Sequence, residues 1–60
     1  MSKITVAYEY YHPLDNKRYQ NTCETKSLPV FEEVIIKWLA TEENKSVDEI
    51  SKYVTFKVID

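Results

Sequence analysis

Few side chains in this chain are of the types that carry out covalent or metal chemistry. Its 60 residues include one histidine, His12, one cysteine, Cys23, and no glycine. Residues 3–25 are predicted to form a β-hairpin, in a register that pairs Tyr11 with Gln20. It separates Cys23 from His12 by ~13 Å at about 3.3 Å per residue, which is too far for a catalytic pair. We expect His12 to be a polar turn residue, Cys23 to be a small buried group, and no catalytic residue, metal or cofactor.

Aromatic and cationic side chains share one short stretch, and they suggest a different kind of chemistry. Four of the five tyrosines lie between residues 8 and 19, where Lys17 and Arg18 directly precede Tyr19. Exposed aromatic rings can stack on nucleobases while neighbouring cations hold the phosphates. One interpretation is therefore single-stranded nucleic-acid binding. Its candidate residues are Tyr11, Lys17, Arg18, Tyr19 and Lys57.

Acidic side chains concentrate in the second half of the chain. The formal charge of the whole chain is −2, whereas residues 31–50 carry six carboxylates and two lysines, a local charge of −4. The strongly basic surface that is typical of nucleic-acid-binding proteins is not expected. An acidic surface instead steers the encounter with a basic partner. The six carboxylates are Glu32, Glu33, Glu42, Glu43, Asp48 and Glu49.

Two alternating segments near the N-terminus predict a β-hairpin. Residues 3–11 alternate with a period of two and are rich in β-branched and aromatic types. Pro13 ends this strand because it has no backbone N–H, and residues 14–17 have the composition of a turn. Residues 18–25 then form a second and more polar strand. Without glycine, turns that need a positive φ must use asparagine.

The alternation also assigns the tyrosines of the first strand to faces. Tyr8 and Tyr10 share one face with Val6, and Tyr11 lies on the opposite face. We expect Tyr8 and Tyr10 to be buried, because tyrosine supplies a large apolar area while its hydroxyl reaches the rim of the core. If helices cover one face of the sheet only, Tyr11 is exposed.

An amphipathic helix follows the hairpin. Pro29 suits the first turn of a helix, and Asn44 suits the left-handed position that closes one. Ser46 begins an S-x-x-E capping box that ends at Glu49 and predicts a short second helix. Apolar residues recur at helical spacing and are expected to face the core. They are Phe31, Val34, Ile35, Trp38 and Leu39.

This helical stripe leaves one apolar residue on the opposite side. At 100° per residue, Ile36 lies about 140° from Phe31, on an outward side that carries carboxylates. An exposed isoleucine surrounded by carboxylates would make a docking spot for a basic partner surface with an apolar centre. The predicted partner-binding residues are Glu32, Glu33, Ile36, Ala40 and Glu43.

The expected fold is a single α+β domain over residues 1–60. Residues 54–59 alternate again and predict a last strand. A three-stranded sheet with one amphipathic helix packed on one face, in ββα(α)β order, is the simplest way to bury these stripes. We expect the last strand to pair with the first in parallel, through a right-handed crossover. The N-terminus has no pattern of a signal peptide, so we expect a cytoplasmic protein.

Three segments also resemble a known layout. The segments "CET" at residues 23–25, "FEEVIIKWLA" at 31–40 and "YVTFKVID" at 53–60 are similar to small phage-encoded proteins that shut down host enzymes, of the bacterial RNA polymerase inhibitor type. The resemblance covers residues 20–59. It implies a strand, strand, helix, strand order and a tight, non-catalytic inhibitor acting in the host cytoplasm. In that family acidic helix residues and basic residues on the last strand hold the polymerase, and here the last strand offers Lys57.

Together these patterns predict a small protein that works by binding another protein and not as an enzyme. A core of this size can hardly surround a catalytic pocket of ~300 Å³ or more. The expected partner is a protein with a basic surface, and the finer hypothesis is a phage-type inhibitor of a larger host or nucleic-acid-handling enzyme. Single-stranded nucleic-acid binding is the second hypothesis. The third is self-association as a structural subunit, through Ile36 or an unpaired edge strand.

Overall fold

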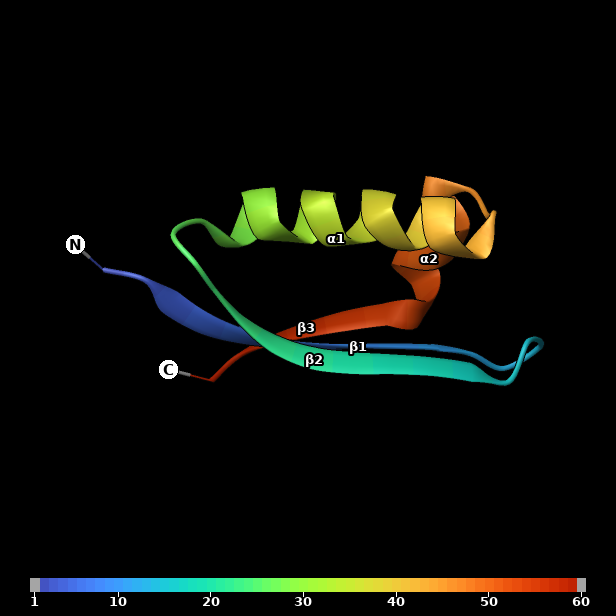
Figure 1. The fold of residues 1–60 in the computed structure, drawn as a ribbon, viewed down its shortest axis with the longest axis horizontal. Helices are drawn as coiled ribbons and strands as arrows, with labels where there is room; N and C mark the ends of the chain where they lie inside the picture. The colour runs from blue at the N-terminus through green and yellow to red at the C-terminus, as the bar shows by residue number, and fades with distance from the viewer. Residues whose placement is uncertain (1, 60) are drawn as a thin grey trace.

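The computed structural model describes residues 2–59, which form a three-stranded sheet with two helices on one of its faces (Figure 1). This confirms the predicted α+β class and the order of the elements. No helix in this range is long and apolar enough to cross a membrane. The elements are β1 (Ile4–His12), β2 (Lys17–Thr25), α1 (Leu28–Glu43), α2 (Val47–Tyr53) and β3 (Val54–Val58).

The sheet has the strand order β2-β1-β3, and both neighbouring pairs are antiparallel. The last strand pairs with the first, as expected, but the predicted parallel direction was wrong. The reason is the path of the chain. β2 ends beside the start of β1, where Thr25 is opposite Ile4, and α1 then carries the chain back toward the hairpin turn (Figure 1). A strand that starts there, with Val54 opposite Tyr10, must run against β1.

The hairpin register differs by two residues from the predicted one. Tyr11 pairs with Arg18, not with Gln20, and Cys23 lies opposite Val6. The four-residue turn that sets this register contains Asn16 in a left-handed conformation, with φ 54°. A shift by an even number of residues leaves every side chain on the same face. The predicted assignment of faces therefore survives the error in register.

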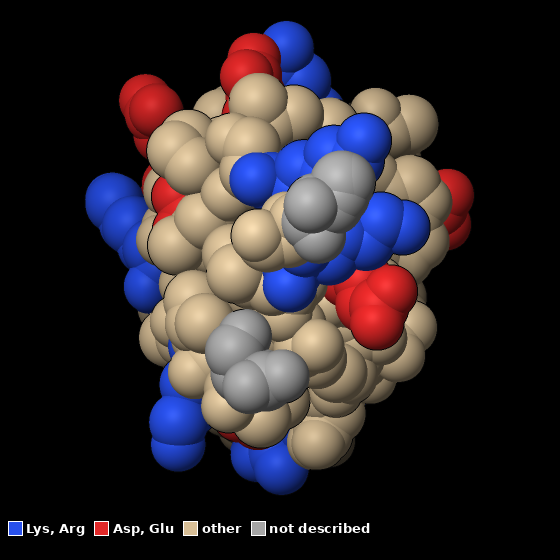
Figure 2. Space-filling view, turned by 90° about the vertical axis from the view of Figure 1, so that its left-hand side faces the viewer, with Lys and Arg blue, Asp and Glu red and all other residues tan. Residues whose placement is uncertain are grey.

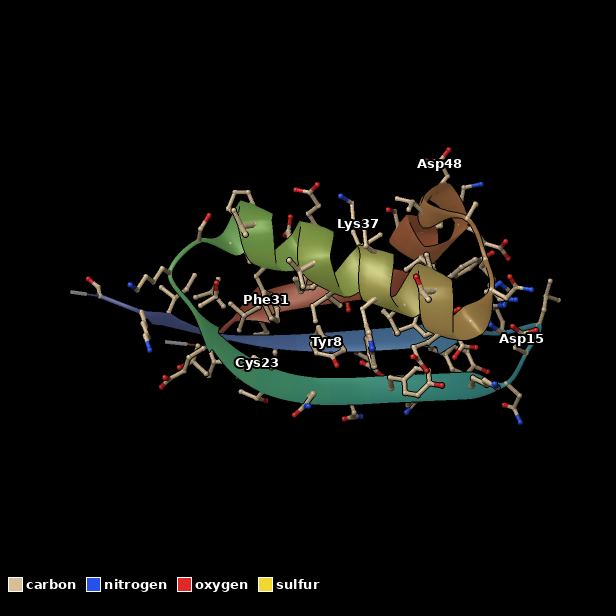
Figure 3. All side chains as sticks on the ribbon, turned by 45° about the horizontal axis from the view of Figure 1, so that its top comes forward. Tyr8, Asp15, Cys23, Phe31, Lys37 and Asp48 are labelled. Atoms are coloured by element: carbon tan, nitrogen blue, oxygen red, sulfur yellow. The ribbon has the colours of Figure 1, made fainter. Side chains whose placement is uncertain are left out.

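The core lies between the sheet and the helices. Its buried cluster takes one residue from each element except β2, namely Tyr10, Leu39, Ile50 and Val54. Tyr8 and Tyr10 are both buried, as predicted. The Tyr8 ring packs at 6.2 Å from the Phe31 ring, and the two side chains point toward each other between β1 and α1 (Figure 3).

Helix α1 is rotated by roughly a quarter turn from the predicted orientation. Leu39 faces the core as expected, but Val34 and Trp38 are 56% and 44% exposed. Ile36 and Ala40, which were expected in solvent, are half-buried and pack against the core cluster. The second helix explains the difference, because α2 packs along one flank of α1 and supplies a second apolar wall. The predicted orientation placed the apolar side of α1 against the sheet, without a contact between α1 and α2.

Local signals place the ends of both helices. Asn44 closes α1 in the left-handed conformation, with φ 57°, and the backbone N–H of Lys45 donates to the Ala40 carbonyl at 3.0 Å. At the start of α2 the Ser46 hydroxyl oxygen accepts a hydrogen bond from the Glu49 N–H at 3.1 Å. The capping residue predicted for the second helix is therefore confirmed.

Candidate functional site

Three of the five predicted partner-binding residues line one hollow on the helical layer. Glu32, Glu33 and Ile36 share this hollow, whose volume is about 360 Å³. Its other lining residue of note is Val47, the first residue of α2, which is 47% exposed. The hollow therefore lies where one flank of α1 meets the beginning of α2. Its full lining is Pro29, Glu32, Glu33, Ile36, Lys37 and Val47.

The hollow has an apolar interior and a charged rim. Ile36 is half-buried, with one side against the core cluster and the other toward the hollow. On the rim, the Lys37 ammonium lies 2.9 Å from a Glu33 carboxylate oxygen, and these side chains are 66% and 64% exposed. An exposed pair of this kind contributes only about 0.2–1 kcal/mol, so a partner can exchange it at little cost.

Carboxylates outnumber cations in and beside the hollow, where Glu32, Glu33 and Asp48 accompany Lys37. In the part of the chain that the structure describes, neither Glu32 nor Asp48 forms an ion pair, and the one lysine on the rim is already paired with Glu33. Lys37 and Asp48 both project away from the sheet (Figure 3). The helical layer thus keeps the acidic character predicted for it, although only part of the predicted set remains available.

Ala40 and Glu43 do not belong to this hollow. Ala40 packs against the core, and the Glu43 side chain is only 3% exposed. Glu43 accepts a hydrogen bond of 2.6 Å from the Tyr19 hydroxyl, and its other oxygen lies 3.5 Å from the Lys17 ammonium. The prediction that Glu43 points outward was wrong, because the rotation of α1 turns it toward β2. Its role is to attach the end of α1 to the hairpin.

His12 was also wrongly predicted, as a simple polar turn residue. It is the last residue of β1 and is only 1% exposed. Its Nε2 lies 2.7 Å from a Glu49 carboxylate oxygen, and its ring lies 4.6 Å from the ring of Tyr53. The signal that could have revealed this burial is the strand alternation, since His12 follows Tyr10 by two positions on the buried face. The pair connects α2 to the hairpin.

Hydrogen bonds shift several pKa values at this end of the molecule. The hydrogen bond to Glu43 raises the pKa of Tyr19, and partial burial adds to the effect. Burial raises the pKa of Tyr10, and the Glu43 charge acts in the same direction. The hydrogen bond between Lys45 and Asp15, at 2.7 Å, lowers the pKa of Asp15 and raises that of Lys45. These groups hold the hairpin turn against the helices.

The structure separates the residues of the nucleic-acid hypothesis into two groups. Tyr11 is 37% exposed on the face of the sheet without helices, where the Arg18 guanidinium lies 5.1 Å from the centre of its ring. Tyr19 points to the other face, packs on Trp38 and donates to Glu43. Tyr11 and Tyr19 therefore cannot form one stacking surface.

The two lysines of that hypothesis are likewise apart. Lys17 is paired with Glu43, whereas Lys57 lines a hollow of about 660 Å³ on the sheet around Ala7. Basic side chains at the end of the molecule where α1 begins lie beside acidic ones (Figure 2). There Lys3, Glu24 and Lys26 line one depression of about 470 Å³. This end is of mixed charge.

Covalent and metal chemistry finds no support in the side chains that are described. Within residues 2–59, no group of three or more His, Cys, Asp or Glu side chains could hold a metal ion. Cys23 is a half-buried free thiol on β2 (Figure 3).

Comparisons with known proteins found no match for this chain among protein-family models, curated sequences or solved structures. The resemblance to phage-encoded inhibitors therefore stays a prediction.

Proposed function

We propose that this protein is a non-catalytic protein-binding module whose binding site is the hollow between α1 and α2. One observation carries the proposal: an apolar interior formed by Ile36 and Val47 is bordered by the carboxylates of Glu32 and Glu33. A partner that inserts one apolar side chain would remove both apolar residues from water. In protein interfaces a few side chains that fill desolvated pockets near the centre supply most of the binding energy.

The charge of the rim defines the chemistry of the partner. The inserted side chain should be flanked by lysine or arginine, because these would meet Glu32 and Glu33 and would compete with Lys37 for Glu33. Complementary charge of this kind raises the association rate and selects the orientation of docking. The finer form of this proposal is an inhibitor that covers a basic surface of a larger host or nucleic-acid-handling enzyme, without chemistry on it.

The test is capture of partners by a variant of the hollow and by a matched control. The hollow variant combines Glu33→Lys with Val47→Ser, both at exposed positions. The control combines Glu42→Lys with Ile59→Ser, also exposed, outside the hollow. Both proteins should keep the circular dichroism spectrum of the wild type.

We expect the wild type and the control to recover the same basic partner, and the hollow variant to lose it by about tenfold or more. Recovery should also fall as salt rises, since charge steers the encounter. Equal recovery of the same proteins by both variants would show that the hollow is not the binding site.

A second candidate function rests on the open face of the sheet. There the exposed Tyr11 ring carries the Arg18 guanidinium at 5.1 Å, an arrangement that can stack on a base of single-stranded nucleic acid. Fluorescence anisotropy with labelled oligonucleotides at low salt tests it. Binding that weakens with salt and with Tyr11→Ala would support this function, and an absence of binding at low salt would end it.

A further inference from the structure

A strip of exposed apolar side chains runs along the flank of α1 that lies away from the hollow. Val30, Val34 and Trp38 are 58%, 56% and 44% exposed. Their spacing of four residues places them on one line of the helix. The Trp38 ring meets the Tyr19 ring edge-on at 6.3 Å, so this apolar strip lies on the β2 side of the molecule.

The backbone edge on the same side is unpaired within residues 2–59. β2 is an edge strand of nine residues, and its only neighbour in the sheet is β1. The backbone N–H of Thr22 donates to the Asn21 side-chain oxygen at 2.8 Å, which indicates that this N–H points away from β1. Long unpaired edges of this kind are templates for pairing with another strand. The apolar strip and the free edge therefore lie on the same side of the molecule, with the Trp38–Tyr19 contact between them.

The charges along β2 show which strand this edge fits. Arg18 lies near its beginning and Glu24 near its end, on the same face of the sheet. In an antiparallel pair of two β2 strands with Asn21 opposite Asn21, Arg18 of each copy lies opposite Glu24 of the other. Opposite charges on facing strands are favourable, and each such pair contributes about 0.2–1 kcal/mol. The sequence of β2 is therefore complementary to itself.

The same two-fold axis aligns the apolar strips. Tyr19 is about 7 Å along β2 from Asn21, which corresponds to four or five residues of helix at about 1.5 Å per residue. Since Trp38 packs on Tyr19 and α1 runs opposite to β2, Val34 lies roughly level with Asn21. The axis then brings Val34 against Val34 of the second copy, and Trp38 against Val30.

The dimensions of strands and helices allow this contact. Strands in a sheet are about 4.8 Å apart, so the two β1 strands of such a pair would be about 14 Å apart. Helices with their side chains are about 10–12 Å wide. Because α1 contacts Tyr8 on β1 and also Tyr19 on β2, each helix lies nearer the axis than β1 does. Two α1 helices above the joined sheet would then be about 10 Å apart, the usual distance of packed helices, and would meet along the flanks that carry Val34 and Trp38. If odd-numbered residues of one β2 strand were opposite even-numbered residues of the other, the helices of the two copies would lie on opposite faces of the joined sheet.

We propose that two copies of this chain form a two-fold symmetric dimer with one continuous six-stranded sheet, through β2 and the Val30–Val34–Trp38 strip. This interface lies on the flank of α1 opposite to the hollow. It therefore leaves both hollows open and does not depend on the function proposed for them. The partner at this surface is a second copy of the chain, because the charge pattern of β2 and the centre of the apolar strip are consistent with the same two-fold axis.

Charge reversal tests the axis by sedimentation equilibrium over a range of concentrations. The wild type should approach twice the mass of the chain as its concentration rises. Arg18→Glu or Glu24→Arg alone places like charges opposite each other and should raise the dissociation constant about tenfold or more. A mixture of the two variants restores opposite charges across both pairs and should recover the dimer. Lys57→Glu, on the other edge of the sheet, is the matched control and should leave the dissociation constant unchanged.

Cross-linking tests the register independently. In the Cys23→Ser background, Asn21→Cys puts two thiols opposite each other at the axis, within disulfide distance. We expect a disulfide-linked dimer on mild oxidation, with far less cross-linking for Lys57→Cys. A wild type that stays monomeric at all concentrations overturns the proposal. So does a dimer that is insensitive to Val34→Glu and shows no recovery on mixing the charge variants.

Discussion

Buried polar residues add specific contacts between the hairpin and the helices to those of the apolar core. Glu43 holds Tyr19 from the end of α1, and His12 on β1 holds Glu49 of α2 at 2.7 Å. Removing one partner of a buried, hydrogen-bonded pair costs more than the bond itself contributes, because the remaining group stays desolvated. In a chain this short the stability margin is small, so these few contacts count heavily. They explain why predicted surface carboxylates turned out to be structural.

The tyrosines next to Glu43 provide a test of this contact. Their neutral phenols are favoured in the folded state, which raises the pKa of Tyr19 by its hydrogen bond and that of Tyr10 mainly by burial. The stability that this contributes is present below the ordinary value of 10.0 and is lost as pH rises through the raised pKa. We expect both tyrosines to ionise late in an absorbance titration, together with loss of the fold.

The variant Glu43→Gln should lower the pKa of both tyrosines toward 10.0, since it removes the neighbouring charge. Glu33→Gln changes an exposed carboxylate and serves as its control. A folded wild type in which Tyr10 and Tyr19 titrate at the ordinary value would contradict the geometry described for Glu43.

The rotation of α1 decides which of its residues are available to a partner. The apolar residues of this helix fit two orientations. In one Val34 and Trp38 face the core, and in the other Ile36 and Ala40 do. The structure has the second, because α2 contacts the side of α1 that carries Ile36. This moves the predicted isoleucine from the surface to the wall of a hollow and leaves the two other residues exposed.

Paired substitutions test the orientation of α1. Ile36→Ala should lower the free energy of unfolding by about 1–2 kcal/mol, because this half-buried side chain packs on the core. Val34→Ala, at a position that is 56% exposed, should change it by less than about 0.5 kcal/mol. Urea unfolding measures both, with protein dilute enough to keep the proposed dimer dissociated. The reverse order of the two effects would support the orientation first predicted from the spacing.

The two surfaces proposed for binding lie on opposite flanks of α1. The hollow contains Ile36 and Val47, and the dimer surface contains Val34, Trp38 and the edge of β2. Helix α1 lies between them and the two surfaces share no residue, so each proposal can be correct or wrong without the other. If both hold, each dimer carries two partner sites that face away from its axis, and avidity would strengthen binding to a repeated or dimeric partner.

Independence of the two surfaces is itself testable. The hollow variant, Glu33→Lys with Val47→Ser, should keep the mass of a dimer while it loses the partner. Val34→Glu should become monomeric while it still captures the partner, at lower yield if avidity contributes. Size-exclusion chromatography with light scattering measures the mass of both proteins. A folded variant that loses both properties at once would show that the surfaces are coupled.

Local patterns were enough to place the elements of this protein. Alternation located the strands, and Asn44 and Ser46 marked the ends of the helices, because each of these signals acts within a few residues of chain. The direction of β3, the rotation of α1 and the pairing of His12 with Glu49 were not accessible in this way. They depend on where α2 packs, through contacts such as His12 with Glu49, which are 37 residues apart. Such contacts exist only once the chain has closed on itself, so no local spacing records them.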